Sequence, residues 1–424
     1  MSRTGVCWVL LVLGAGGLGA LVADDHRLAI AAATLVLVVG IFAADPIFLA
    51  VLALPGAFLL QRVGSSGTNL SISDVLVFVG AIIALFNVDW KEARNLRRFL
   101  LGVVVYEAIL ILVVAYHPNR DDVIEWFHRF SDLAGSALIG WVIAAHRRVG
   151  QALRLYLLGA VIIAVLAMEH AITLHFLPAQ WGLYQKNAIG AMMWPAIVVT
   201  QLRPAWTELS TRAVRLTKYL CVGGLLASQS RQAAVVLICA LGAAFLLHPD
   251  VRRRFKLVIP GLLALCVSLY FSFAAELRNS PKFSSVAIRI DQLTAALKVW
   301  HLSPILGEGL RFYNLHPFVY VTAPPNIVID ALASSGVVGL IALVILVVAT
   351  VGEMARLPRQ FGLLGLLILA GHYVDGLFDV FWVGASIAGP FIIAGICLGL
   401  SDRLVADGVG REMPQIKRRP RQFQ

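Results

Sequence analysis

Charged residues are scarce in this sequence. Only 14% of its 424 residues are Asp, Glu, Lys or Arg, whereas 59% are apolar. A soluble globular chain carries about 25% charged and about 45–50% apolar residues. Such a shortage of polar surface excludes a water-soluble enzyme, a disordered chain and a secreted disulfide scaffold.

Cysteine pairs and the common catalytic motifs are missing as well. The five cysteines lie inside or beside apolar runs, and none forms a C-x-x-C pair or lies near a histidine at ligand spacing. The sequence contains no P-loop, no H-E-x-x-H and no G-x-S-x-G motif. We therefore predict neither a disulfide framework nor a bound metal or cofactor.

What the sequence has instead is apolar length. A membrane-spanning helix needs about 20 consecutive, mostly apolar residues, and such windows recur from Val6 to Leu400. We predict an all-α, polytopic membrane bundle of about 12–14 spanning helices, forming a single membrane domain over residues 1–424. The candidate spans are 6–23, 27–44, 46–60, 74–88, 99–116, 130–145, 152–169, 188–202, 214–229, 231–247, 256–275, 327–350, 361–379 and 383–400. We expect the first to be retained, because it lacks a small-x-small cleavage pattern.

Basic residues fall between the apolar segments. Lys and Arg outnumber Asp and Glu by 35 to 24, which in a soluble chain would point to nucleic acid, but cytoplasmic loops of membrane proteins show the same bias. The basic clusters all fall on one side of the membrane: 90–98, 146–154, 203–218, 249–256, 353–360 and the tail 401–424. We predict a multi-pass protein of the cytoplasmic (inner) membrane, with both termini cytoplasmic, that contacts membrane lipid and no nucleic acid.

The longest polar segment is residues 276–326, which the alternation of spans places outside the cytoplasm. Loops of this length are usually functional or disordered. Residues 290–300 (IDQLTAALKVW) follow a helical apolar pattern. We therefore expect an amphipathic helix lying at the outer membrane surface.

Basic residues on the predicted outer face are exceptions to the charge bias. Arg231 separates two apolar spans with almost no loop, so it is either a snorkelling anchor or a clamp for an anion such as phosphate. Arg289 begins the amphipathic segment, and it either pairs with Asp291 or binds a ligand. Lys186 and Asn187 form a further polar couple on the same face.

Glycines cluster after the long loop. Gly307 and Gly309 flank a glutamate in a turn-like sequence, while Gly336 and Gly339 lie early in the next span. Glycine allows close backbone approach, and we interpret Gly336 and Gly339 as helix-packing positions. Glu107 lies mid-span, where a carboxyl group is a functional site, a partner of a nearby arginine or a protonated core group.

Four short motifs, taken in order, resemble those of the O-antigen ligase and polymerase superfamily, which comprises integral-membrane glycosyltransferases of the GT-C type. The motifs are Lys186-Asn187 before a middle span, Ser230-Arg231 facing outward, Arg289 ahead of a P-x-x-G-x-G stretch at 304–309 (PILGEG), and Asn326 nine residues before Gly336-x-x-Gly339. They cover roughly residues 180–345, and their order agrees with the predicted topology.

One family position differs in this chain. The histidine of the family's H-N motif is replaced by Pro325, and proline cannot exchange a proton. Two groups are candidates for the missing base: His316 in the same loop, and Asp330, one turn beyond Asn326 on a similar helix face. Alternatively, Asn326 caps the helix and Asp330 only favours its positive N-terminus.

The resemblance implies transfer of a glycan from a polyprenyl-diphosphate donor to a hydroxyl on a glycan or glycolipid, outside the cytoplasm. We expect Arg231 and Arg289 to clamp the diphosphate without a metal, and Lys186, Asn187 and Asn326 to contact substrate. Two other functions stay open: a permease or flippase for an anionic lipid or sugar, and a non-catalytic scaffold of envelope assembly.

Overall fold

The computed structural model of the chain describes residues 40–62 except residue 42, and residues 71–247, 285–315, 323–382 and 384–406. The regular elements within these ranges are helices, accompanied by two isolated β-bridges. The predicted spans 6–23 and 256–275, and most of 27–44, lie outside the described residues, as do residues 407–424 of the predicted tail.

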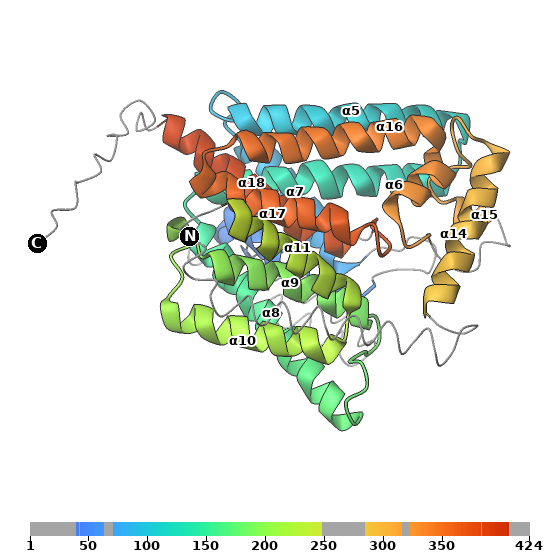
Figure 1. The fold of residues 1–424 in the computed structure, drawn as a ribbon. Coiled ribbons are helices and arrows are strands. Elements are labelled where there is room, and N and C mark those ends of the chain that lie inside the picture. Colours follow the sequence, from blue (N-terminus) through green and yellow to red (C-terminus); the bar gives the residue numbers. More distant parts are fainter. Residues whose placement is uncertain are drawn as a thin grey trace, which may run out of the picture.

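Each predicted span within the described ranges coincides with a helix (Figure 1). The helices are α3 (Pro46–Gly56), α4 (Ile72–Asn87), α5 (Arg94–Tyr116), α6 (Arg120–Phe130), the π-helix η1 (Ser131–Gly135), α7 (Ser136–Ala145), α8 (Val149–Thr173), α9 (Lys186–Leu202), the short 3₁₀ helix η2 (Ala205–Thr207), α10 (Thr211–Ser228), α11 (Arg231–Leu247), α14 (Ser285–Leu302), α15 (Phe312–Leu315), α16 (Ile327–Arg356), α17 (Arg359–Asp375) and α18 (Gly384–Ala406).

Four helices of the described part are long and apolar enough to cross a membrane: α5, α8, α16 and residues Ser386–Val405 of α18. Helices α3, α4 and α11 are shorter but also apolar. The prediction of an all-α, polytopic membrane bundle is confirmed. The total of about 12–14 spans stays a prediction.

Large apolar side chains cover the outside of these helices. Leu101 on α5, Ile162 on α8 and Val348 on α16 are 63%, 52% and 66% exposed. In water such apolar faces would drive the protein to associate. In a bilayer the lipid chains are as apolar as leucine, so they solvate these faces. The outward faces are therefore those of lipid-facing helices.

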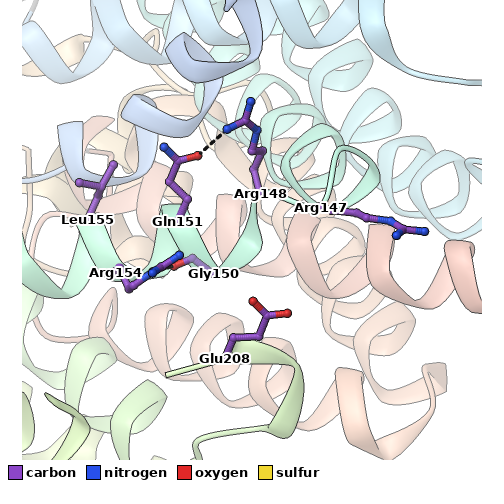
Figure 2. A pocket seen from close by; sticks show the side chains of 7 residues that line it. All are labelled: Arg147, Arg148, Gly150, Gln151, Arg154, Leu155 and Glu208. Carbon is purple, nitrogen blue, oxygen red and sulfur yellow. Dashed lines mark hydrogen bonds between the residues drawn. The ribbon is translucent and has the colours of Figure 1, made fainter. Parts of the chain in front are cut away.

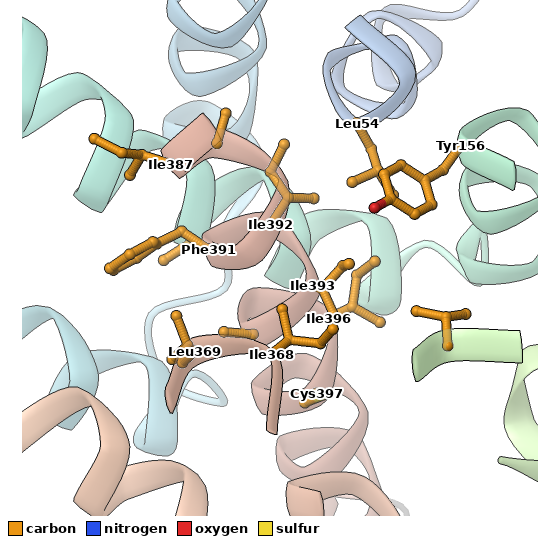
Figure 3. Close-up of a cluster of buried hydrophobic side chains, with 14 of the residues drawn as sticks. Leu54, Tyr156, Ile368, Leu369, Ile387, Phe391, Ile392, Ile393, Ile396 and Cys397 are labelled. Atoms are coloured by element: carbon orange, nitrogen blue, oxygen red, sulfur yellow. The ribbon is translucent and has the colours of Figure 1, made fainter. Parts of the chain in front are cut away.

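Helix α18 forms the centre of the bundle. Of its apolar window, 83% is buried inside the protein, compared with 39% for α5 and for α8. Figure 3 shows Ile392, Ile393 and Ile396 of α18 among side chains from α3, α8 and α17. Gly140 of α7 and Gly395 of α18 let two backbones meet, because a Cβ on Gly140 would collide with the carbonyl oxygen of Ile392.

The basic connections within the described ranges meet at one end of the bundle, which we call the basic end: residues 90–98, 146–154, 203–218, 353–360 and 401–406. Hydrogen bonds join these connections to one another. They run from the Asn95 backbone N–H to Asp402 Oδ1 (2.9 Å), from Arg403 Nη1 to the Ala144 carbonyl (3.0 Å) and from Trp206 Nε1 to the Gln360 carbonyl (2.8 Å). The clustering predicted from charge thus has a structural counterpart.

The C-terminal boundary of α18 differs from the sequence prediction. The helix continues to Ala406, so the first residues of the predicted tail 401–424 belong to the bundle. Asp402 explains the difference, because its carboxylate accepts hydrogen bonds from the Asn95 backbone at 2.9 Å and from the Trp141 indole at 3.0 Å. An aspartate held in this way extends the packed helix beyond its apolar run.

At the opposite end, α14 and α15 cover the bundle (Figure 1). We call this the α14 end; it also holds the N-termini of α9, α11 and α16. Helix α14 spans Ser285–Leu302 and confirms the helix predicted at 290–300. The His117 Nε2 atom lies 2.8 Å from the Gly307 carbonyl oxygen, and the Arg311 N–H donates to Asp122 Oδ1 at 2.8 Å. These contacts attach the long connection to α5 and α6.

Helix α16 is broken at Gly336, whose φ of +64° lies in the left-handed region. The segment 304–309 fills the break. Four backbone hydrogen bonds hold it there: Glu308 N–H to Ala333 carbonyl, Gly309 to Ser334, Val337 to Pro304 and Val338 to Ile305, at 3.0, 3.0, 2.9 and 3.2 Å. The prediction that Gly336 serves ordinary helix packing is wrong, because a second backbone segment replaces the missing helical partners.

Candidate functional site

The first group of predicted site residues lies where α10 turns into α11. Gln229, after the end of α10, adopts φ +50° and reverses the chain. Ser230 then caps α11, since its Oγ accepts a hydrogen bond from the Ala233 N–H at 3.4 Å. Arg231 is the first residue of α11 and is half-buried. The tight turn therefore fixes an arginine at a helix N-terminus, where the macrodipole also favours anions.

Arg289 reaches this helix N-terminus from α14. Its Nη2 donates to Gln232 Oε1 at 3.3 Å, and Gln232 Nε2 donates to Asp379 Oδ2 at 2.9 Å. Among the described residues, Arg289 forms no ion pair with Asp291, the local partner considered from the sequence. The structure thus joins Arg289 to the neighbour of Arg231, across a long separation in the chain.

The Lys186-Asn187 couple opens α9 beside the same turn. Lys186 and Asn187 are the first two residues of α9 and are half-buried. Ser230 Oγ donates to Asn187 Oδ1 at 3.5 Å. Gly190 permits this approach, because a Cβ there would lie 2.5 Å from the Ser230 Cβ. The α9 couple is therefore brought next to the arginine-bearing turn.

Asn326 caps α16. Its Oδ1 accepts from the backbone N–H groups of Val328 and Ile329 at 3.0 and 3.1 Å, and its Nδ2 donates to the Leu377 carbonyl at 2.9 Å. The capping role considered from the sequence is confirmed. The connection after α17 carries both Leu377 and Asp379, so it links Asn326 to the Gln232–Arg289 pair. We call Lys186, Asn187, Arg231, Gln232, Arg289, Asn326 and Asp379 the polar cluster.

Asp330 lies elsewhere, in a buried ion cluster formed by Asp122, Glu125, Arg129, Arg311 and Asp330. Arg129 Nη2 lies 3.9 Å from Asp330 Oδ2, and its Nε donates to Glu125 Oε1 at 3.1 Å. Arg311 Nε donates to the other Glu125 oxygen at 3.0 Å. Asp330 is only 3% exposed. The Asp330 carboxylate therefore has a charged partner and is shielded from the protein surface.

The buried ion cluster touches the polar cluster through Trp382. The Arg129 guanidinium lies over this ring, 4.2 Å from its centroid, and Trp382 follows Asp379 by three residues. Cation–π contacts of desolvated arginines contribute about 2 kcal/mol. The N-terminal turn of α16 is thus flanked by Asn326 in one cluster and Asp330 in the other.

Helix α6 lies outside the candidate membrane spans, and two of its three acids, Asp122 and Glu125, respond to burial differently. Burial alone would raise the pKa of Glu125, but the guanidinium groups of Arg129 and Arg311 outweigh it and lower that pKa. Burial raises the pKa of Asp122, although hydrogen bonds from the Arg311 backbone and from Asn119 oppose the shift. Glu125 is therefore the carboxylate that the two arginines hold ionised.

Glu107 is buried near the middle of α5, as predicted. Its carboxylate accepts no hydrogen bond from a described residue, and no described arginine lies within ion-pair distance of it. Its backbone carbonyl accepts a hydrogen bond from Trp126 Nε1 at 3.1 Å. A direct arginine partner of Glu107, one of the three interpretations from the sequence, is therefore not observed among the described residues.

Several members of these clusters escaped the sequence reasoning. They are Gln232, Asp379, Asp122, Glu125, Arg129 and Arg311. Gln232 adjoins Arg231, and Asp379 lies in a predicted outer connection, so both were within reach of a search for polar residues at span ends. Glu125 and Arg129 are spaced i, i+4 in a polar connection, which is an ion-pair pattern on a helix. His316, the other predicted base, lies outside the described residues.

Two cavities lie among the described residues, one next to the buried ion cluster and one far from both clusters. One, of about 750 Å³, lies beside the start of α6 and is lined by residues including Asn119 and Val123. The other, of about 520 Å³, lies at the basic end (Figure 2). Among the described residues, no three His, Cys, Asp or Glu side chains are grouped to hold a metal ion. The cationic side chains of the polar cluster are Lys186, Arg231 and Arg289.

Comparison with known proteins identifies part of the chain. Residues 216–344 match the family model described as O-antigen ligase. The matched part includes Arg231, Arg289, Asn326 and Asp330, while Lys186, Asn187 and Asp379 lie beyond it. No curated protein matches the sequence. The match over residues 216–344 confirms the family resemblance noted from the motifs.

Proposed function

From this match we propose that the protein transfers a glycan from a polyprenyl-diphosphate donor to a hydroxyl group of a second glycan or a glycolipid. The observation that carries the proposal is the Arg289–Gln232 hydrogen bond of 3.3 Å. It draws a loop arginine to the helix N-terminus that begins with Arg231. Two guanidinium groups at a helix N-terminus suit a diphosphate, because each forms charge-assisted, bidentate hydrogen bonds with phosphate oxygens.

The reaction breaks the bond between the anomeric carbon and the diphosphate oxygen, and it forms a bond from that carbon to the acceptor oxygen. The acceptor hydroxyl loses its proton, while the leaving diphosphate gains negative charge. Arg231 and Arg289 stabilise this developing charge, which is where fixed cations lower a barrier. Lys186 adds a third positive charge at the start of α9. The proposed transfer therefore needs no metal for charge neutralisation.

The proposed transfer also needs a group that takes the proton from the acceptor hydroxyl. Asp330 is buried beside Arg129, a place that keeps an acceptor sugar away. His316 lies in the same long connection of the sequence as Arg289. We assign proton acceptance to His316, and to Asp330 the positioning of Arg129 and Trp382.

Orientation follows from charge. The basic connections meet at one end of the bundle, and lysine and arginine favour the cytoplasmic side. The proposed orientation puts the basic end in the cytoplasm and the α14 end outside. Lipid-linked donors would then reach Arg231 from the outer leaflet of the cytoplasmic membrane.

A permease for an anionic lipid or sugar is the second candidate, because α16 is broken at Gly336 and broken helices form the sites of many transporters. The segment 304–309 occupies this break with four backbone hydrogen bonds. A break that is filled by a bonded segment suits an anchored loop better than the moving gate of a permease. A scaffold without activity is the third candidate.

One experiment separates the three. The purified full chain is placed in vesicles with a polyprenyl-diphosphate oligosaccharide and a glycolipid acceptor, with and without EDTA. We expect a new glycosidic linkage and release of polyprenyl diphosphate in both conditions. Movement of intact donor between leaflets without bond cleavage would identify a permease, and neither event would identify a scaffold. Activity that EDTA abolishes would overturn the metal-independent clamp.

A further inference from the structure

The cavity at the basic end lies at the opposite end of the bundle from the polar cluster. It has a volume of about 520 Å³ and lies between the start of α8 and the connection that follows α9 (Figure 2). Its lining residues are Arg147, Arg148, Gly150, Gln151, Arg154, Leu155 and Glu208. Three arginines therefore line one cavity that has a single acidic side chain in its lining. Figure 2 shows the Arg147 side chain extending away from the other lining groups.

Arg147 occupies a backbone position that normally favours glycine. Helix α7 ends in a Schellman motif: the Arg147 N–H donates to the Ala144 carbonyl at 3.1 Å, and the Arg148 N–H donates to the Ile143 carbonyl at 2.9 Å. The residue after the helix cap in this motif adopts a left-handed backbone conformation, and Arg147 accordingly has φ +58°. Side chains other than glycine adopt this conformation at a cost. The chain accepts that cost at a position where an arginine lies at the rim of the cavity.

The other two arginines are held by local contacts. Arg148 Nη2 donates to Asp45 Oδ2 at 2.6 Å, and its Nη1 donates to Gln151 Oε1 at 3.1 Å. Arg154 Nε donates to the Gly150 carbonyl at 2.9 Å. Among the described residues, the Arg154 amino groups and the whole Arg147 guanidinium have no hydrogen-bond partner. These nitrogen atoms are thus left for an anion to use.

Glu208 faces these donors without pairing with them. Its Oε2 atom would lie 3.2 Å from a Cβ on Gly150, and Figure 2 shows the carboxylate turned toward that backbone. No ion pair joins Glu208 to any of the three arginines. Asp45 balances the charge of Arg148 and Glu208 that of one further arginine, so one positive charge remains in excess at the cavity. This excess predicts an anionic ligand, and Glu208 limits how tightly it binds.

The surface of α8 indicates what kind of anion this is. Arg154, Leu158 and Ile162 follow at intervals of four residues, so they share one helix face, and Val165 continues the same stripe. Leu158, Ile162 and Val165 are 54%, 52% and 46% exposed. A cationic cavity that leads into an exposed apolar stripe on a membrane-spanning helix suits a molecule with an anionic head and an apolar tail.

We propose that this cavity binds the phosphate of an anionic phospholipid, with Arg147 and Arg154 as hydrogen-bond donors, Arg148 as a fixed neighbouring cation, and an acyl chain along Leu158 and Ile162. Basic pockets between spanning helices are suited to lipid head groups. The site is independent of the proposed transfer, since it lies at the other end of the bundle. The basic end would then bind a specific ligand, in addition to following the general preference of lysine and arginine for the cytoplasmic side.

Native mass spectrometry of the full chain in detergent tests the proposal. The probes are phosphatidylglycerol, phosphatidylcholine of the same chain length, glycerol 3-phosphate and inorganic phosphate. We expect phosphatidylglycerol to bind most tightly, and Arg154→Gln to weaken it about tenfold or more. Arg147→Gly should weaken binding too, while its melting temperature stays at or above that of the wild type because the left-handed position is relieved. Glu208→Gln should tighten binding about two- to fivefold.

Arg97→Gln is the matched control. Arg97 is an exposed arginine at the basic end, and it precedes the exposed Leu101 of α5 by one turn, but it does not line the cavity. Equal weakening by Arg97→Gln and Arg154→Gln would overturn the site in favour of diffuse attraction. Glycerol 3-phosphate binding as tightly as the lipid would overturn the lipid assignment and identify a soluble phosphorylated ligand.

Discussion

Arg289 and Gln232 form a hydrogen bond between α14 and the first turn of α11, with Nη2 of the arginine 3.3 Å from Oε1 of the glutamine. The contact makes the position of the loop helix and that of Arg231 interdependent. It also explains why a residue far along the chain can act beside the turn that carries Arg231.

The guanidinium geometry of the two arginines should matter more than their charge. Lysine keeps the charge but loses the planar fork, so Arg231→Lys and Arg289→Lys should each reduce kcat/KM nearly as much as alanine does. The expected loss of transition-state stabilisation is about 2–4 kcal/mol. Arg97→Lys at the basic end is the control and should leave transfer unchanged. Lysine variants as active as the wild type would show that both arginines are generic surface charges.

Gln232 is expected to position Arg289. Gln232→Leu removes the hydrogen bonds to Arg289 and Asp379, and we expect kcat/KM to fall by the equivalent of about 1–3 kcal/mol. A double-mutant cycle with Arg289→Lys is the decisive measurement, since residues in contact give non-additive effects. Strict additivity of the two changes would contradict the positioning role.

Proton acceptance can be assigned by comparing two variants. Asp330→Asn weakens a buried pairing with Arg129, so we expect the free energy of unfolding to fall by about 1–3 kcal/mol. His316→Ala should leave folding unchanged and reduce transfer more than Asp330→Asn, once activities are normalised to folded protein. The reverse ranking would make Asp330 the base. Full activity of both variants would mean that neither side chain accepts the proton.

The break in α16 gives a stability prediction with a control in the same helix. Gly336→Ala puts a Cβ into the Ile305 carbonyl at a left-handed φ, so it should destabilise the protein by more than about 1 kcal/mol. Gly352 has open space where its Cβ would be, and Gly352→Ala should stabilise the helix by about 0.5–1 kcal/mol. Thermal unfolding in detergent measures both. Equal effects would mean that the segment 304–309 does not depend on the break.

Glu125 should make stability pH-dependent. Its pKa is lower in the folded protein than in the unfolded chain, because Arg129 and Arg311 outweigh burial. Its contribution is therefore fully present above the unfolded pKa of about 4.3 and disappears as the pH falls through the folded value. Unfolding of the wild type between pH 7 and pH 3 should show this loss, and Glu125→Gln should show a shallower slope. Identical slopes would place the acid sensitivity elsewhere.

Apolar length was enough to predict the apolar helices, because a bilayer demands long apolar segments and every backbone group must be paired within them. The polar helix α6 was not predicted, since it lies in an expected connection. Pairing between distant residues was not predictable. The sequence singled out Arg289 but gave no reason to choose Gln232 as its partner over Asp291. The break at Gly336 was equally hidden, since the apolar pattern continues on both sides and the replacement partners lie in segment 304–309. Asp330 was recognised as an acid near a helix start, whereas its contact with Arg129 depends on how α6 meets α16.

The central place of α18 has a consequence for biogenesis. Helices α3, α5, α7 and α17 all pack against α18, and all of them precede it in the chain. During synthesis they enter the bilayer before the helix that fills the space between them exists. Until α18 arrives, the surface of α7 around Gly140 must be covered by lipid or by an insertion factor. Final compaction is therefore a late event, and a ribosome that stalls before Gly384 would release helices without a common core.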